Sequence, residues 1–580
     1  MSSRRLPVPP EHREFEILID GEALPRSHAA MAVVTSSRVN KIATAELWFA
    51  DGDAASSEFT LSSSEYFVPG KTIQIRAGTA NEQHDIFHGI VVSQALKIRE
   101  QAPPQLHVVC KHDAVRMSLQ EHDAAYFEQT DSDIMATLAQ THQVQADVAS
   151  TEVTHEQMAQ WRSCDWDFLL HRALANGLLV FTKGAQLQVR KPETSESVMT
   201  LQFGATVLAF DAEIDARDAL NASQTLAWDA GQQQTQQRDG ADTGFSEAGN
   251  LSTSDLAEAL AREPLQLSHT RLSESEAQQW ADAARKFSHL DKSQGRLKCH
   301  GVATVHAGDW ITLSGFGERF SGEVLVTGVN QEYDVSNGWR TQLQFGGVVA
   351  SVQQIWLQQR QSSMSMPLVP NTLGLQIGVV TDNEDPSGEH RVRVHLPLMV
   401  QDSDGLWARV ATLDAGDDRG FFFRPEIGDE VVVGFFEQDA RYPVLLGMLH
   451  SSAKAAPLSA SNDNHEKQYK SRSGMTWTVN DEKKSMHLAT PAGQEVLLSD
   501  DEKGISLKDQ HGNRIVLNQD GIVIESATAL QLKTGTTLAV DAGSSLGLKA
   551  AADLKLEGTA GAELSSTAIT TVKGSMLQLN

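Results

Sequence analysis

The chain has few cysteines and no long apolar run. Its 580 residues include only three cysteines, Cys110, Cys164 and Cys299, which lie far apart and form no C-x-x-C pair. This usage is typical of a reducing compartment and predicts neither a disulfide framework nor a structural metal site. No stretch of 18 or more apolar residues occurs, and arginines and prolines stand where a signal peptide needs an apolar segment. We therefore expect neither membrane spans nor a cleaved export signal.

Positive charge is scarce. The sequence has 48 Lys and Arg against 75 Asp and Glu, which gives a formal net charge of −27. A field of this sign repels phosphate backbones, so nucleic acid is excluded as an expected partner. Aromatic residues make up only 6% of the chain, but a hydrophobic fraction of 40% is sufficient for folded domains. At roughly 100 to 200 residues per domain, the length predicts several of them.

Motifs of catalysis and cofactor binding are missing as well. Neither G-x-x-x-x-G-K-[ST] nor H-E-x-x-H occurs, which removes support for phosphate cradling and zinc hydrolysis. Acid and base residues are adjacent at His112-Asp113, His122-Asp123 and His155-Glu156. However, adjacent residues of a strand face opposite sides, and no nucleophile recurs at a fixed spacing. We interpret these as surface pairs and expect no catalytic residue, cofactor or metal ligand.

The C-terminal region repeats every eight residues. The first apolar register is Ile522, Leu530, Leu538, Leu546, Leu554 and Ala562, and the second is Ile524, Leu532, Val540, Leu548, Leu556 and Leu564. Small or polar residues fill the places between these apolar pairs, and Gly535 and Gly543 share one position of the period. Each repeat therefore predicts a short apolar-x-apolar strand followed by a bend.

The length of this repeat indicates how many chains are needed. A single-chain β-helix with three faces requires roughly 18 or more residues per coil, whereas eight extended residues span at most about 26 Å. Eight residues thus supply one face and one corner of a triangular prism. We predict a homotrimeric needle in which three chains supply one face each and the apolar residues point toward the shared axis. A flat amyloid-like or a solenoidal sheet of a single chain is the alternative.

The needle region is almost neutral, in contrast to the rest of the chain. From Gly521 to Asn580, four lysines stand against five acidic residues. Long-range repulsion therefore does not oppose the close approach of three chains. Upstream, apolar residues alternate with polar ones around Trp477, Val496, Ile505 and Ile515, which predicts strands that lead into the needle.

A second unit precedes the needle. Between residues 373 and 450, turn residues separate six short apolar or alternating runs, at 375–380, 392–396, 406–410, 421–423, 430–436 and 444–449. Five or six short strands at this spacing are typical of a small closed barrel of the OB kind. OB barrels often bind oligonucleotides, but the loops of this one are acidic. A structural barrel is therefore favoured.

The first 370 residues contain a looser repeat. Pro69-Gly70 and a strand, then Phe87-His88-Gly89 and a strand, are echoed by Gly308-Asp309 and Phe320-Ser321-Gly322. This predicts two related β-barrels, at about 12–125 and 295–348, with a glycine at each F-x-G site permitting a bulge or close backbone contact. Helices are expected at 166–176, 273–287 and near Ser132, with Trp166 in the core, and 229–258 is expected to be an exposed loop.

Collinear motifs support a family resemblance over more than 450 residues. They occur in this order at 67–71 (FVPGK), 86–91 (IFHGIV), 130–134 (TDSDI), 163–169 (SCDWDFL), 172–177 and 424–431 (RPEIGDEV). In these segments and in its order of parts, the sequence resembles the VgrG family, the central spikes of contractile injection systems. The resemblance implies a mainly β protein with tandem hub β-barrels and minor helices at 1–370, an OB-fold barrel at 373–450, a linker at 451–471, and a trimeric triple-stranded β-helix needle at 472–580.

The resemblance also implies partners and a location. A homotrimer would adapt the hexameric inner tube to a needle that pierces a target membrane, in contact with baseplate and hub proteins and effectors. It would assemble in the cytoplasm and leave with the injection particle. A small PAAR-like tip protein would dock on an apolar end surface, for which the expected residues are Met576, Leu577, Leu579 and Asn580. The linker is too short for an enzyme domain.

Two other functions remain open. A trimeric β-helix tailspike that binds or degrades polysaccharide would need long single-chain coils or a broad acidic groove, whereas this needle has a short period. A passive trimeric adhesin would usually need an export signal or membrane anchor. The residues do not distinguish a type VI secretion spike from the spike of an extracellular injection particle.

Overall fold

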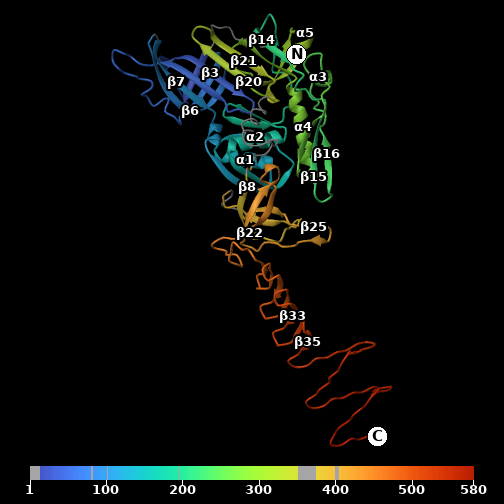
Figure 1. Ribbon diagram of the computed structural model, residues 1–580. Coiled ribbons are helices and arrows are strands. Elements are labelled where there is room, and N and C mark those ends of the chain that lie inside the picture. Colours follow the sequence, from blue (N-terminus) through green and yellow to red (C-terminus); the bar gives the residue numbers. More distant parts are fainter. Residues whose placement is uncertain are drawn as a thin grey trace. The chain divides into compact units, whose positions relative to one another are not determined.

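The computed structural model describes residues 14–79, 82–100, 102–193, 195–349, 372, 374–398 and 404–579. The chain divides into two compact units, Met1–His450 and Ser451–Asn580, and Figure 1 shows the elements of each. Strands account for 43% of the structure and helices for 12%. The predicted mainly β fold is confirmed.

The largest element of the first unit is a 13-stranded sheet. Its path runs β14-β18-β21-β20-β3-β4-β7-β6-β5-β1-β2, and β19 and β13 join it through β20. Strands from both regions expected as barrels lie in this one sheet, because β3 pairs antiparallel with β20. The strands are β1 Glu14–Ile19, β2 Glu22–Ala23, β3 Ala30–Arg38, β4 Thr44–Ala50, β5 Thr72–Thr79, β6 Glu82–Arg99, β7 Ala102–Lys111, β13 Met199–Gln202, β14 Val207–Ile214, β18 Ser293–His300, β19 Trp310–Ser314, β20 Gly322–Asp334 and β21 Gly338–Phe345.

The two F-x-G glycines permit close backbone contacts, as the sequence predicts. A Cβ atom on Gly89 would lie 2.1 Å from the carbonyl oxygen of Lys111. A Cβ atom on Gly322, whose φ is +140°, would lie 2.7 Å from the Cα atom of Ala248. Any side chain at either position would therefore push adjoining backbone apart.

Helices and small sheets fill the middle of the first unit. The helices are α1 Asp131–Thr141, α2 Asp165–Ala175, α3 Thr253–Ala259, α4 Glu274–Leu290 and α5 Gly317–Phe320, and the 3-10 turns are η2 Arg26–His28, η3 Asp113–Ser118 and η4 Phe436–Gln438. The small sheets pair β8 Glu121–Thr130 with β10 Thr154–Cys164; β9 Gln145–Val148 with β12 Gln186–Arg190 and β11 Leu179–Lys183; and β15 Ser223–Asp229 with β16 Gln234–Asp239 and β17 Leu265–His269.

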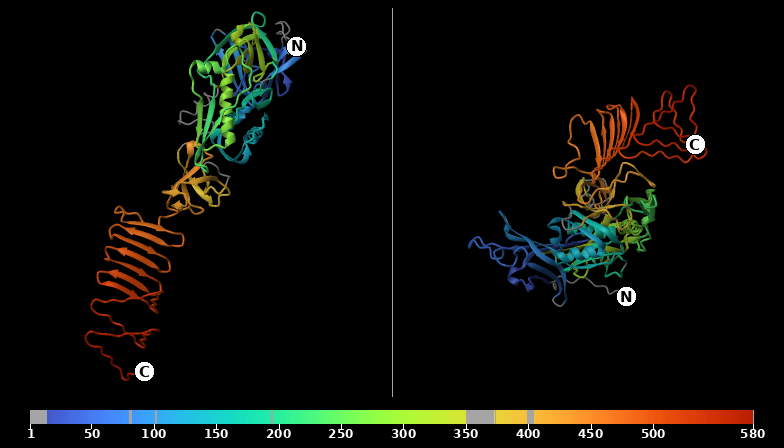
Figure 2. Two further views of the ribbon diagram at one scale, coloured as in Figure 1. Left: turned by 90° about the vertical axis from the view of Figure 1, so that its right-hand side faces the viewer. Right: turned by 90° about the horizontal axis from the view of Figure 1, so that it is seen from below.

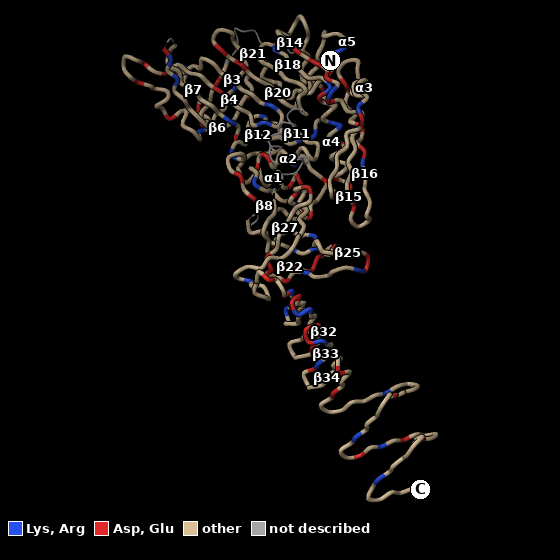
Figure 3. The backbone as a smooth tube through the Cα atoms, in the orientation of Figure 1, with Lys and Arg blue, Asp and Glu red and all other residues tan. Residues whose placement is uncertain are grey.

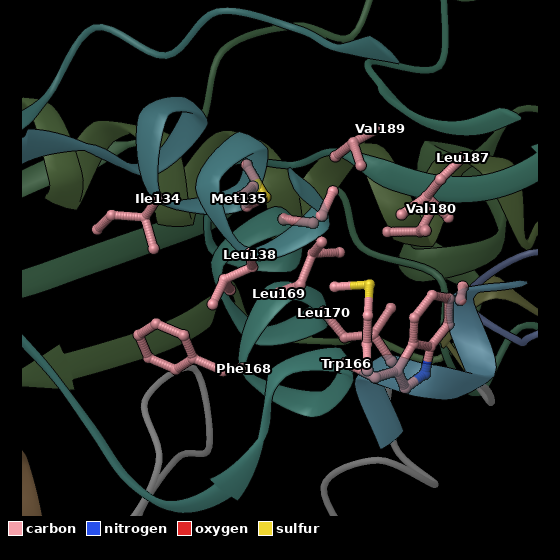
Figure 4. Close-up of a cluster of buried hydrophobic side chains, with 14 of the residues drawn as sticks. Ile134, Met135, Leu138, Trp166, Phe168, Leu169, Leu170, Val180, Leu187 and Val189 are labelled. Atoms are coloured by element: carbon pink, nitrogen blue, oxygen red, sulfur yellow. The ribbon is translucent and has the colours of Figure 1, made fainter. Parts of the chain in front are cut away.

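Helices α1 and α2 enclose one of the hydrophobic cores. Trp166 is 6% exposed and belongs to the same cluster of buried side chains as Ile134, Leu138 and Leu169, which Figure 4 shows. Its predicted place in the core is confirmed. Ser273 caps α4 through a reciprocal capping box with Glu276, so the predicted start of this helix is also correct.

The expectation of an exposed loop at 229–258 holds for residues 240–252, which form neither helix nor strand, but is wrong for the two ends of the segment. Strand β16 pairs antiparallel with β15 along its whole length, and α3 begins within this stretch. The Ser252 hydroxyl accepts a hydrogen bond from the Asp255 backbone N–H, and the Asp255 carboxylate accepts one from the Ser252 backbone N–H. Backbone pairing and capping therefore order the ends of a segment that is rich in Gln, Ser, Asp and Gly.

The predicted small barrel is present and closed. It consists of β22 Gln376–Asp382, β23 Val392–His395, β24 Leu406–Val410, β28 Pro443–Met448 and β27 Glu430–Phe435. Of the six apolar runs, the one at 421–423 forms no strand: its phenylalanines are exposed and follow the short hairpin of β25 Ala415–Gly416 and β26 Arg419–Gly420. Five strands already close the barrel, so no strand edge is free to pair with a sixth strand.

Buried ion pairs connect the barrel to the helical region. Arg441, which follows the barrel strand β27, donates a 2.6 Å hydrogen bond to Glu276 of α4 and lies 2.8 Å from Asp439. Gln157 of β10 donates a 2.6 Å hydrogen bond to the Arg441 carbonyl. Although burial disfavours the charged form, Arg441 and His269 hold the pKa of Asp439 below its usual range. The two regions are therefore held in a fixed geometry by desolvated charges.

The second unit is built from short strands in sequence order. β29 Glu466–Lys470, β30 Thr476–Asn480, β31 Ser485–Ala489, β32 Glu495–Ser499, β33 Gly504–Lys508, β34 Arg514–Asn518 and β35 Gly521–Glu525 form a seven-stranded sheet. Strand β29 falls within the segment expected as a linker, so the sheet begins before residue 472. None of the helices in the described ranges has the length and apolar character needed to span a bilayer.

Replacing Arg441 with methionine is expected to destabilise the first unit by about 3–5 kcal/mol, because Glu276 and Asp439 would stay buried without their cation. Denaturant unfolding of the full chain measures this loss. The matched control is Arg419→Ala in the same barrel region, since the side chains of Arg419 and Asp414 are 66% and 50% exposed. The control should change stability by no more than about 0.5 kcal/mol. Equal effects of the two variants would contradict a structural role for the buried pair.

Candidate functional site

The sheet of the second unit carries two apolar ladders on one face. Successive strands pair antiparallel, and Figure 2 shows them side by side. The first ladder of directly opposed residues is Tyr469, Trp477, Leu488, Val496, Leu507, Ile515 and Ile524. The second is Val479, Met486, Leu498, Ile505, Leu517 and Ile522. Because residues two apart point to the same side of a strand, both ladders share one face.

This apolar face is open to solvent in the single chain. Trp477 is 50% exposed and Leu488 48% exposed. A groove of about 690 Å³ runs along the face, and its lining includes Leu488, Val496, Leu507 and Ile515. A contiguous apolar surface of this kind is typical of an interface.

Beyond β35 the chain bends once in every repeat. The bends lie at 527–528, 535–536, 543–544, 551–552, 559–560 and 567–568, with another at 575. The predicted bend in every eight-residue repeat is therefore confirmed, whereas the predicted short strand between bends is not formed in the single chain. Within the described residues from 526 to 579, no strand pairing occurs. A chain that turns a corner at each repeat cannot pair with its own next repeat, so its backbone groups need other chains.

The predicted interface residues form one continuous exposed series. Their exposed fractions lie between 50% and 77%, and the series comprises Ile522, Ile524, Leu530, Leu532, Leu538, Val540, Leu546, Leu548, Leu554, Leu556 and Leu564. Met576, Leu577 and Leu579, expected at the tip, are 84%, 61% and 85% exposed. Asn580, the fourth expected tip residue, lies outside the described residues.

Three members of the apolar face were missed by the sequence reasoning. Tyr469 lies on β29, and Met486 and Leu488 lie on β31. The apolar-x-apolar pattern of Met486 and Leu488 matches that of the neighbouring strands and could have revealed β31. Tyr469 is flanked by Gln468 and Lys470 and gave no such signal, because only its pairing with Trp477 places it in the ladder.

The expectation that the adjacent acid and base residues are surface pairs is wrong for two histidines. His155 is 5% exposed, and its Nε2 atom lies 3.1 Å from Asp131, which also pairs with Arg172 at 2.6 Å. Its neighbour Glu156 turns elsewhere and accepts hydrogen bonds from Arg391 at 2.8 and 2.9 Å. Glu156 therefore contacts Arg391 and does not pair with the histidine beside it in sequence, whereas Asp131 lies between His155 and Arg172.

His112, the second of these histidines, is completely buried. Its Nδ1 atom accepts a 3.1 Å hydrogen bond from the backbone N–H of Ala114 and thereby caps the turn η3. Burial lowers the pKa of His112 to about 4. The neutral ring is therefore the form that the fold requires. Among the described residues, no three His, Cys, Asp or Glu side chains gather in a metal-binding arrangement.

Three family models match successive parts of the chain. Residues 10–334 match the Alg8 N-terminal domain. Residues 376–450 match the type VI secretion system/phage-baseplate injector OB domain. Residues 485–559 match the phage baseplate V C-terminal trimerisation domain. The last match includes most of the apolar ladders and much of the eight-residue series.

Curated relatives are spike proteins. The type VI secretion system spike protein VgrG1a of Pseudomonas aeruginosa is 26% identical over 269 residues, which cover 42% of this chain and 38% of the relative. VgrG1c of the same species is 26% identical over 258 residues, which cover 41% of this chain and 32% of the relative. The chain thus spans less than two fifths of the length of either relative.

The fold has a solved counterpart. In the structure of the half-lidded Francisella PdpA-VgrG complex, one chain superposes with a TM-score of 0.52 at 8% identity, covering 88% of each chain. The lidless form of that complex gives the same TM-score over 86% of this chain and 98% of the other. At this identity the likeness concerns the fold alone.

Acidification should weaken the first unit through His112. Its folded-state pKa of about 4 lies below the ordinary value of about 6.5, so its contribution is complete above pH 6.5 and is lost as pH falls toward 4. Between pH 7.5 and 5.0 the loss is about 2 kcal/mol. In His112→Asn, whose amide oxygen can still cap η3, the pH dependence of unfolding should diminish by this amount. The exposed His390→Asn control should retain it; identical profiles of all three proteins would contradict the assignment.

Proposed function

The chain belongs to the family of the Alg8 N-terminal domain and is a VgrG-like spike protein, and we propose that three copies form the central spike of a contractile injection system. The observation that carries this proposal is the exposed apolar series of the second unit, in register with one bend per eight residues. Three chains wound around one axis would bury this series and pair its backbone.

Each part has a role in this proposal. The sheet-rich first 349 residues would form the hub, and a trimer of hubs would present its two related halves as six positions that match a hexameric inner tube and its baseplate. The barrel would connect the hub to the needle. When the sheath contracts, the needle would pierce the target membrane, and the spike would leave with the injection particle.

The proposal assigns no catalytic step to this chain. The candidate acid–base residues are occupied in structural contacts, as with His155 on Asp131 and Glu156 on Arg391. The matches to an injector OB domain and to VgrG spike proteins favour a spike over a polysaccharide-degrading tailspike. They do not separate the type VI and extracellular kinds of particle.

One experiment tests both the number of chains in the oligomer and which residues face its axis. The wild-type chain should have three times its mass of 63.1 kDa, about 189 kDa, by light scattering. In Leu538→Asp, three carboxylates would be buried around the axis without partners, at several kcal/mol each. We expect this variant to lose the trimer or to unfold at a much lower temperature.

Ala539→Asp is the matched control, because residue 539 points to the opposite side of the extended segment from residue 538. It should remain trimeric with nearly unchanged stability. A stable 63.1 kDa wild-type monomer would refute the trimer. A trimeric Leu538→Asp protein as stable as Ala539→Asp would instead show that Leu538 does not face the axis.

A small tip protein of the PAAR kind is proposed to dock on the apolar residues that follow the bend at 575. Met576, Leu577 and Leu579 are largely exposed, and three copies of each would make an apolar plateau with unpaired backbone groups around it. Any zinc would belong to the tip protein. A tip protein bound there would bury the apolar residues, pair the free backbone groups and make the end of the spike narrower.

Truncation after Gly574 tests this docking surface. The shortened chain should stay trimeric, because it retains the ladders and the six paired bends from 527 to 568. When co-expressed with a PAAR-type protein, it should capture less than about a tenth of the amount captured by the full chain, since a loss of about 1.4 kcal/mol already reduces affinity tenfold. Equal capture by the two trimers would place the docking surface elsewhere.

A further inference from the structure

Charged residues recur in the needle at the same eight-residue spacing as the apolar pairs. Counted from Glu525, the positions eight residues apart are Glu525, Lys533, Asp541, Lys549, Glu557, Ser565 and Lys573. The sign of the charge alternates through the first five positions, is interrupted once by serine, and ends on lysine. We call this series the charge column. Figure 3 shows isolated blue and red segments along this part of the chain.

The charge column has a constant place in the repeat. Each member from Glu525 to Lys573 lies two residues before a bend, as Lys533 lies before the bend at 535 and Asp541 before that at 543. Each of the first five also directly follows the second apolar residue of its repeat, as Glu525 follows Ile524. Because successive residues of an extended segment point to opposite sides, the charges face outward when the apolar residues face the axis.

Threefold symmetry determines which members of the column become neighbours. This step depends on the trimer proposed above. A chain moves to the next face of the prism at each bend, so its own consecutive repeats lie on different faces. Rotation about the axis then places repeat n of one chain beside repeat n+1 of another on the same face. Neighbouring strands are about 4.8 Å apart, so the column residues of adjacent repeats come within reach of an ion pair.

In that register every contact between the first five positions joins opposite charges from two different chains. Lys533 would lie between Glu525 and Asp541 of other chains, and Lys549 between Asp541 and Glu557. The start of the column already makes such a contact within the chain, because Glu525 accepts a 2.6 Å hydrogen bond from Arg514 on the adjacent strand β34. Opposite charges directly across from each other stabilise a strand pair.

The apolar repeats alone cannot set this register. If one chain slips by eight residues, its leucines and valines meet equivalent apolar residues, and the core is nearly unchanged. The charges respond differently: a slip of one repeat places position n beside position n or n+2, which carry the same sign. Like charges directly opposite each other are destabilising.

We propose that the charge column is the surface through which three copies of this chain select their register in the needle. Its partner is a second copy of the same chain, and the ligand chemistry is lysine against carboxylate at alternate levels. The hydrophobic residues hold the chains together, whereas the alternating charges decide which repeats stand side by side.

The test exchanges two charges and preserves composition. Asp541→Lys/Lys549→Asp keeps the net charge, but on every face it sets a second lysine beside Lys533 and a second carboxylate beside Glu557. The matched control, Glu482→Lys/Lys483→Glu, makes the same kind of exchange in the exposed turn between β30 and β31. In low salt, the column exchange should lower the melting temperature of the trimer by roughly 5 °C or more, and the control should not. Near 1 M salt the difference should shrink, because the screening length falls to about 3 Å.

Disulfide cross-linking measures directly which repeats of two chains lie side by side in the needle. In Thr534→Cys/Ala542→Cys, the two positions are eight residues apart and adjoin the column, so a correct register places 534 of one chain beside 542 of another. Oxidation should give 534–542 links between chains in the wild-type column, and a clearly lower yield of these links in the exchanged column, where two of the four contacts of that register join like charges. The native cysteines are buried. An exchanged protein with the wild-type melting temperature and the wild-type yield of 534–542 links would overturn the proposal while leaving the trimer intact. A monomeric wild-type chain would overturn the proposed function itself.

Discussion

The second unit depends on one constraint. Its apolar residues recur every eight residues and have to be buried, but a single chain cannot bury them. Along 522–564 the apolar pairs recur every eight residues and remain at least half exposed. Eight residues reach only about one face of a prism, so no fold of a single chain closes over them. Folding and association of the needle are therefore expected to be a single event, with stability that depends on concentration.

The two units solve the problem of burial in different ways. The first unit closes its cores within the chain, through helices packed on sheets and a barrel without free edges. It also places charges inside, at Arg441 and Arg172, where each cation has carboxylate partners. In the described part of the second unit, the large apolar side chains lie on an open face instead. The first unit thus buries its own cores, whereas the second leaves an apolar face open to solvent.

The repeated apolar residues hold the chains together but do not determine which repeats stand side by side. Equivalent leucines at every level allow several registers of similar energy, and polar or charged positions commonly supply the missing specificity in repetitive assemblies. Alternating charges on the outer corner of each repeat would supply it here at little expense in solvation, because exposed side chains keep most of their hydration.

The sequence by itself determined the features that depend on local periodicity. The eight-residue repeat predicted the bends from 527 to 575, the turn spacing predicted the five barrel strands, and Ser273 with Glu276 predicted the start of α4. Each of these follows from interactions within a few residues or from a pattern repeated many times. Only the tertiary structure placed His112 and His155 in the interior, joined β3 and β20 in one sheet, and paired Arg441 with Glu276 across 165 residues. Those contacts join residues that no local pattern relates, because burial of a polar group depends on which distant partner satisfies it.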